Sequence, residues 1–170
     1  MRQRSYEAIP TGAYHGSVDL RWVAPDKFLY IPNETDPFYF QRANGEIIKP
    51  GLIYTDGGTI PRALWRRPVN SPWGYAPAYL IHDWIVDREV ESLTRAEIQR
   101  ADQILAEGIK TLMEAENDID PDPSALRRVQ RTISSRVAKR NGKEIPWHNH
   151  LPSPEDAVER KSVFLPEVEE

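Results

Sequence analysis

Hydrophobic and polar residues alternate over short runs in the N-terminal half of the chain. The runs are rich in aromatic and β-branched residues and are separated by Pro, Asn, Asp or Gly, which is typical of strands joined by turns. This pattern predicts strands at residues 17–23, 27–31, 38–41 and 46–54. Asn44-Gly45 lies between the last two and tolerates the positive φ angles of a tight hairpin turn. We therefore expect a small antiparallel sheet.

Apolar residues recur at helical spacing in the C-terminal half. Residues 76–88 are expected to form a first helix, and residues 94–116 a second that begins with a capping box of Thr94 and Glu97. A third helix is expected at residues 124–139. A strand-rich first half followed by a helical hairpin and a third helix predicts an α+β fold.

The length of 170 residues fits one domain. Residues 1–142 carry the periodic patterns, and we expect them to form this single α+β domain. Residues 143–170 are rich in Pro and Glu with scattered apolar residues, so we expect an extended or mobile acidic tail there.

Composition narrows the classes of function. The chain has no cysteine, which excludes disulfides, thiolate zinc sites and cysteine nucleophiles, and suits a reducing cytoplasm. A net charge of −4 provides no general attraction to nucleic acid, so no sequence-specific nucleic-acid binding is expected. No stretch of about 18 apolar residues and no signal peptide is found, so we expect a soluble protein without a membrane span.

His82 and Asp102 are the candidate catalytic pair. If the first two helices form an antiparallel hairpin that turns near Ser92, both side chains lie ten residues from the turn and share the apolar, facing sides of their helices. A buried carboxylate needs a partner, and a carboxylate that orients an imidazole leaves the other ring nitrogen available as a general base. The alternative is that the pair is only a hydrogen bond within the core.

Asp83 is rotated by about 100° around the helix from His82 and faces elsewhere. The upstream loop offers the Asp56 carboxylate and the backbone carbonyls of Gly57 and Gly58, a set of oxygen ligands that suits calcium. The same Asp-Gly-Gly sequence is also typical of an ordinary turn.

Four aromatic residues could bind a substrate beside this site, although aromatics in such a position also commonly belong to the core. They are Trp65, Trp73, Tyr75 and Tyr79.

The tract Thr-Asp-Gly-Gly-Thr-Ile-Pro-Arg at residues 55–62, followed by His82-Asp83 and later by Asp102, resembles an uncharacterised family frequent in tailed bacteriophages and prophages. The likeness covers residues 10–112. It implies phage origin, a place in the host cytoplasm or the virion, and other phage structural proteins as partners, but no reaction. The chain departs from the pattern at Val86, where such relatives tend to have Tyr.

The arrangement also looks locally like the calcium-dependent histidine-aspartate phospholipase A site. That likeness implies His82 as base, Asp102 as its orienting partner, and Asp83 with Asp56 as calcium ligands. The chain lacks the disulfides, the signal peptide and the Tyr of that family.

Two hypotheses follow. In the first, the chain is a metal-assisted hydrolase of an ester or phospholipid. In the second, it is a non-catalytic phage virion or assembly protein in which the His-Asp pair ties two helices together. An HD-type phosphohydrolase is a weaker third hypothesis, because that chemistry needs more metal ligands than four histidines suggest.

Overall fold

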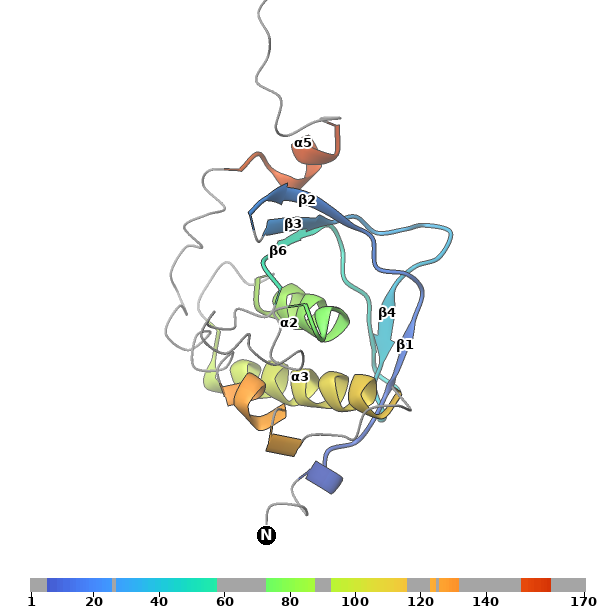
Figure 1. Ribbon diagram of the computed structural model, residues 1–170, viewed down its shortest axis with the longest axis vertical. Helices are drawn as coiled ribbons and strands as arrows, with labels where there is room; N and C mark the ends of the chain where they lie inside the picture. Colours follow the sequence, from blue (N-terminus) through green and yellow to red (C-terminus); the bar gives the residue numbers. More distant parts are fainter. Residues whose placement is uncertain are drawn as a thin grey trace, which may run out of the picture.

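The computed structural model describes residues 6–25, 27–57, 73–87, 93–115, 123–124, 126–131 and 151–159. Small antiparallel sheets occupy the N-terminal half and helices the C-terminal half, so the predicted α+β class is confirmed. Helix α2 lies in the middle of the molecule, between the strands β2, β3 and β6 on one side and helix α3 on the other (Figure 1).

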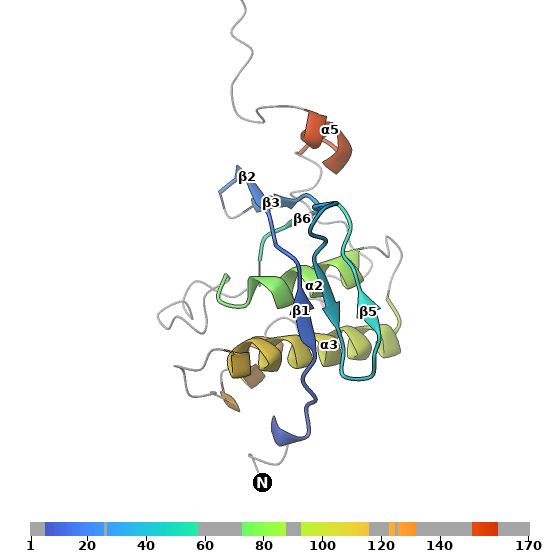
Figure 2. The same ribbon diagram turned by 90° about the vertical axis from the view of Figure 1, so that its right-hand side faces the viewer.

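The first sheet has the order β1-β4-β5, with strands Ala13–His15, Tyr39–Gln41 and Ile47–Ile48. The three lie side by side along one flank of the helices (Figure 2). The predicted hairpin joins β4 and β5, and Gly45 has the positive φ of 86° that its turn requires. β1 was not predicted, since its three residues are too short for a visible alternation.

The second sheet has the order β2-β3-β6, with strands Leu20–Ala24, Lys27–Tyr30 and Ile53–Thr55. The prediction of one strand over residues 46–54 is therefore wrong, because β5 and β6 belong to different sheets. Pro50 explains the break, since it has no N–H to donate to a ladder and is found mainly at strand ends and edges.

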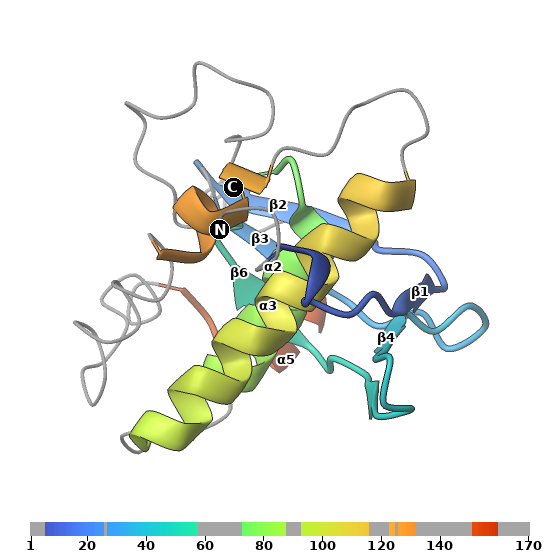
Figure 3. The same ribbon diagram turned by 90° about the horizontal axis from the view of Figure 1, so that it is seen from below.

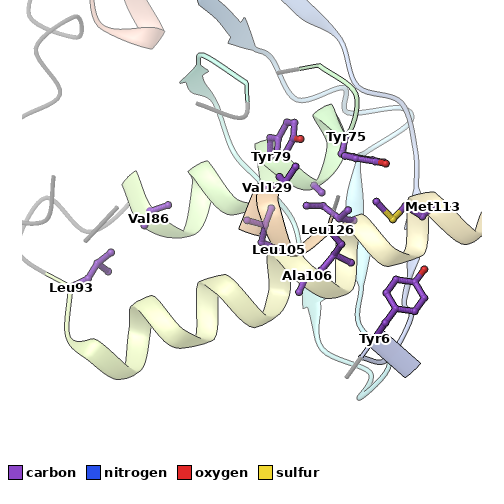
Figure 4. Close-up of a cluster of buried hydrophobic side chains, with 12 residues drawn as sticks. Tyr6, Tyr75, Tyr79, Val86, Leu93, Leu105, Ala106, Met113, Leu126 and Val129 are labelled. Carbon is purple, nitrogen blue, oxygen red and sulfur yellow. The ribbon is translucent and has the colours of Figure 1, made fainter. Parts of the chain in front are cut away.

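Helices α2 (Ala76–Asp87) and α3 (Arg95–Ala115) form the predicted antiparallel hairpin. Figure 4 shows Val86 and Leu93 at one end of their shared core and Tyr75 and Met113 at the other. Viewed from below, α3 crosses the molecule beneath α2 (Figure 3). None of the described helices is long and apolar enough to cross a membrane.

The predicted capping box is confirmed. The Thr94 N–H donates to Glu97 Oε2 over 2.6 Å, and the Glu97 N–H donates back to Thr94 Oγ1 over 3.3 Å. The Thr94 hydroxyl also donates to Glu97 Oε2 at 2.6 Å, and this bond together with that from the Thr94 N–H lowers the pKa of the Glu97 carboxyl, because both favour its charged form.

Within the predicted tail, the described residues 151–159 include a helix, α5 (Pro154–Glu159). Ser153 caps the helix by accepting from the Asp156 N–H at 3.1 Å, and Pro154 stands at its first position, where a missing N–H has no effect. Ala157 is fully buried against the second sheet. Of the predicted third helix, residues 123–124 and 126–131 are helical, and residues 132–139 lie outside the described residues.

Candidate functional site

The end of strand β6 is attached to α2 by a short hydrogen bond. Thr55 Oγ1 donates to Asp83 Oδ2 at 2.6 Å and itself accepts from the Gly57 N–H at 3.0 Å. The φ of 72° at Gly57 lets the chain turn back over Thr55, a conformation that is strained for residues with a Cβ. The end of β6 and the His-Asp helix therefore meet, and Thr55, the last residue of the strand, makes the hydrogen bond.

His82 precedes Asp83 on α2 and is 2% exposed. Its Nδ1 lies 3.9 Å from Asp83 Oδ1, which is beyond hydrogen-bond distance but within the range of an ion pair when the imidazole is protonated. Thr55 holds the other oxygen of the same carboxylate. The imidazole and an anchored carboxylate are thus fixed side by side at the junction of the sheet and the helix.

Asp102 lies on α3, and its backbone carbonyl accepts a hydrogen bond of 3.1 Å from Gln130 Nε2. His82 Nε2 and Asp102 Oδ1 are both buried from solvent. The orienting role of Asp102 therefore stays a prediction.

Asp56, the predicted calcium ligand, forms an ion pair with Lys27 from β3, with Nζ and Oδ2 3.6 Å apart. Among the described residues, no group of three or more His, Asp or Glu side chains is arranged to hold a metal ion. Asp83 is engaged by Thr55, and calcium usually takes six to eight oxygen ligands. The calcium site therefore stays a prediction, and Gly58 lies outside the described residues.

The predicted substrate-binding aromatics separate into two groups. Tyr75 and Tyr79 are buried in the core between the helices, in edge-to-face contact with ring centroids 6.4 Å apart (Figure 4). Burial raises the pKa of the Tyr79 phenol. Trp73 is partly buried and packs edge-on against Phe28 at 4.4 Å. Trp65 lies outside the described residues, so only Trp73 among the four is placed near a surface.

A second polar cluster, which the sequence did not reveal, joins α3 to the β4–β5 hairpin. Glu107 is 1% exposed and accepts hydrogen bonds from Arg42 Nε at 2.9 Å and from the Ala43 N–H at 2.7 Å. Arg42 also donates to Glu46 at 2.8 Å, and Arg100 of α3 pairs with the same carboxylate. The only signal in the sequence was a Glu placed between small residues on the otherwise apolar side of the helix.

Burial and ion pairing have opposing effects on this cluster. Burial alone would lower the pKa of Arg42, but its hydrogen bonds to Glu46 and Glu107 raise it overall. Burial would raise the pKa of Glu46, but Arg42 and Arg100 lower it below the usual 4.5. Arg42 and Glu46 therefore remain ionised at neutral pH.

Comparison with known proteins gives one match. Residues 34–117 match the family described as "Protein of unknown function (DUF1353)". No curated protein and no solved structure matches the chain at a significant level. The matched stretch contains β4, β5, β6, α2 and α3, whereas Lys27 and α5 lie outside it. The junction of Thr55, His82 and Asp83 thus lies within the part of the chain that matches a protein family of unknown function.

Proposed function

We propose that the chain is a hydrolase whose site lies where the end of β6 meets α2, with His82 as general base. The observation that carries this proposal is the 2.6 Å hydrogen bond from Thr55 to Asp83, which fixes a carboxylate beside the imidazole. A charged group held within a few ångströms of a buried imidazole favours its protonated form, because the local dielectric is low. Such a pair can take up a proton and later return it.

The reaction is hydrolysis of an ester, with a phospholipid as the proposed natural class. His82 takes a proton from water as the oxygen attacks the ester carbonyl carbon. The tetrahedral intermediate then expels the alcohol oxygen as the carbon–oxygen bond breaks, and the imidazolium returns the proton to that oxygen. Asp83 stabilises the transient positive charge on His82, and Asp102 is proposed to orient the ring. The proposed setting is a phage protein in the host cytoplasm or the virion.

Turnover of p-nitrophenyl esters and of phosphatidylglycerol vesicles tests the proposal. His82→Ala and Asp102→Asn should each abolish hydrolysis, and the double variant should be no worse, because the two groups act as one unit. His15→Ala is the matched control, since His15 is exposed on β1 and stacks on Tyr39 away from α2. Equal activity in the His82→Ala and His15→Ala proteins would eliminate His82 as the base.

Calcium belongs to the proposal as an added ligand, and no reaction step depends on it. To bind Asp56 it must displace the Lys27 ammonium. Lys27→Met should therefore increase the rise in melting temperature that millimolar calcium produces, since a ligand of the folded state stabilises it by mass action. If neither calcium nor a chelator changes the melting temperature of the wild-type protein or the variant, the protein does not bind calcium at this site.

The alternative function is a non-catalytic virion or assembly protein, and the burial of His82 favours it. In that case Thr55, Asp83 and His82 only attach the sheet to the helix. The wild-type protein would show no turnover on either substrate, while Thr55→Val would lower the free energy of unfolding by about 1–3 kcal/mol, because it leaves the Asp83 carboxylate and the Gly57 N–H without their partner.

A further inference from the structure

A groove of about 540 Å³ runs between the end strand β5, the C-terminal part of α2 and the start of α3. The groove has a mixed lining of apolar residues (Ile47, Ile48, Trp84 and Ile85) and charged residues (Glu46, Lys49 and Arg100). Four consecutive residues, 46–49, line it. Because alternate side chains of a strand face opposite sides, an uninterrupted run of lining residues means that the groove follows the edge of the strand.

The hydrogen-bond pattern of the hairpin shows which backbone groups face this edge. The Arg42 N–H donates to the Glu46 carbonyl at 2.8 Å, and Gln41 is opposite Ile47 in the register. Hydrogen-bonded and non-hydrogen-bonded pairs alternate in an antiparallel ladder, so the N–H and C=O of Ile47 point away from β4. The Ile47 side chain is 60% exposed. The edge therefore offers backbone donors and acceptors beside the apolar side chains of Trp84 and Ile85, as strand-addition sites do.

The charge at the rim is locally positive, although the whole chain carries −4. Glu46 and Glu107 are matched by Arg42 and Arg100, which leaves Lys49 in excess. Within the described residues, Lys49 has no ion pair and is exposed. The groove therefore fits an apolar peptide that continues into acidic residues.

We propose that this groove binds residues 162–170 of a second copy of the chain. The sequence Ser-Val-Phe-Leu-Pro-Glu-Val-Glu-Glu has three consecutive apolar residues followed by three glutamates within four positions. We expect its backbone to pair with Ile47, its apolar side chains to contact Trp84 and Ile85, and its glutamates to face Lys49. The reciprocal exchange joins two copies about a two-fold axis.

A second copy is the source because of where α5 lies. α5 packs through Ala157 on the second sheet, away from β5, and both side views place it beyond that sheet (Figures 1 and 2). Leu165 follows Glu159 by six residues, a stretch that spans about 20 Å when fully extended. We assign the segment to a neighbouring molecule, and the double-cysteine chain described below tests this choice.

Disulfide trapping tests the proposal, because the chain has no cysteine of its own. Full-length Ile47→Cys protein is mixed with isotope-labelled full-length Leu165→Cys protein in a glutathione redox buffer, and mixed dimers are counted by mass spectrometry. The matched control replaces the first protein by Trp22→Cys, which places the thiol on another exposed apolar residue of an end strand, 51% exposed. We expect at least a tenfold higher yield of mixed dimer from Ile47→Cys than from Trp22→Cys.

Two further measurements decide the source and the role of charge. Adding Lys49→Glu to the Ile47→Cys protein should lower the yield several-fold, and adding Glu167→Lys and Glu169→Lys to the Leu165→Cys protein should restore it. Equal yields from Ile47→Cys and Trp22→Cys would overturn the proposal. A double Ile47→Cys, Leu165→Cys chain that closes only within itself at all protein concentrations would overturn the second copy as source.

Discussion

Replacing Glu107 by Ala removes the carboxylate that connects α3 to the β4–β5 hairpin. The variant loses two hydrogen bonds, from Arg42 Nε at 2.9 Å and from the Ala43 N–H at 2.7 Å. Hydrogen bonds to charged groups contribute about 1.5–3 kcal/mol each, and breaking a buried ion pair by removing one partner costs about 3–5 kcal/mol. Because Arg42 keeps its bond to Glu46, we expect a loss of about 3–4 kcal/mol in the free energy of unfolding.

Urea unfolding followed by circular dichroism measures this loss. Glu107→Gln keeps an acceptor for Ala43 without the charge, so it should cost about 2 kcal/mol. Glu46→Ala is the matched control, because Glu46 pairs with the same Arg42 guanidinium. The Glu46 side chain is one-third exposed, so this variant should lose less than about 1 kcal/mol in the free energy of unfolding. A double-mutant cycle with Arg42→Ala should give a coupling of about 2 kcal/mol. A loss below about 1 kcal/mol for Glu107→Ala would refute the claim that the cluster holds the hairpin.

Three further predictions concern packing, pH and capping. A Cβ added to Gly108 would lie 2.3 Å from the Tyr14 hydroxyl, so Gly108→Ala should lower the melting temperature despite its gain in helix propensity, and Tyr14→Phe should recover most of the loss. Folding lowers the pKa of Glu46, so its contribution to stability is present above its ordinary pKa of 4.5 and is lost as the pH falls through the pKa of the folded state. Glu46→Gln should therefore weaken the pH dependence of the urea midpoint between pH 5 and 3. Ser153→Ala removes the cap of α5 and should increase the amide exchange of that helix without altering exchange in α3.

The helices and the hairpin could be predicted because their signals are local. The capping box at Thr94, the turn at Asn44-Gly45 and the apolar spacing of α2 and α3 each act within a few residues. Division of the strands into two sheets could not be predicted, since it depends on pairing between distant segments such as β1 with β4. The break at Pro50 was the one local signal, and it lies in the middle of an apolar run that otherwise favours a single strand.

The candidate site was predicted in part. The sequence indicated that the upstream loop and His82-Asp83 would meet, because both combine polar side chains with turn or helix signals. It did not indicate that Thr55 would make the contact while Asp56 turned to Lys27, since both depend on the exact register of β3 and β6. Glu107 was missed because an interior Glu in a helix is normally a solvent-exposed residue.

The two polar connections attach the helical hairpin to different sheets. The effect of a His82 substitution on stability can therefore be measured separately from its effect on turnover. Thr55 connects α2 to the second sheet, and Glu107 connects α3 to the first. The position of His82 is therefore set by contacts that do not need its own imidazole. A large loss of stability in His82→Ala would then mean that the ring itself is a structural connection. Loss of turnover with less than about 1 kcal/mol of destabilisation would instead assign the ring to the reaction, so both quantities must be measured on the same variant.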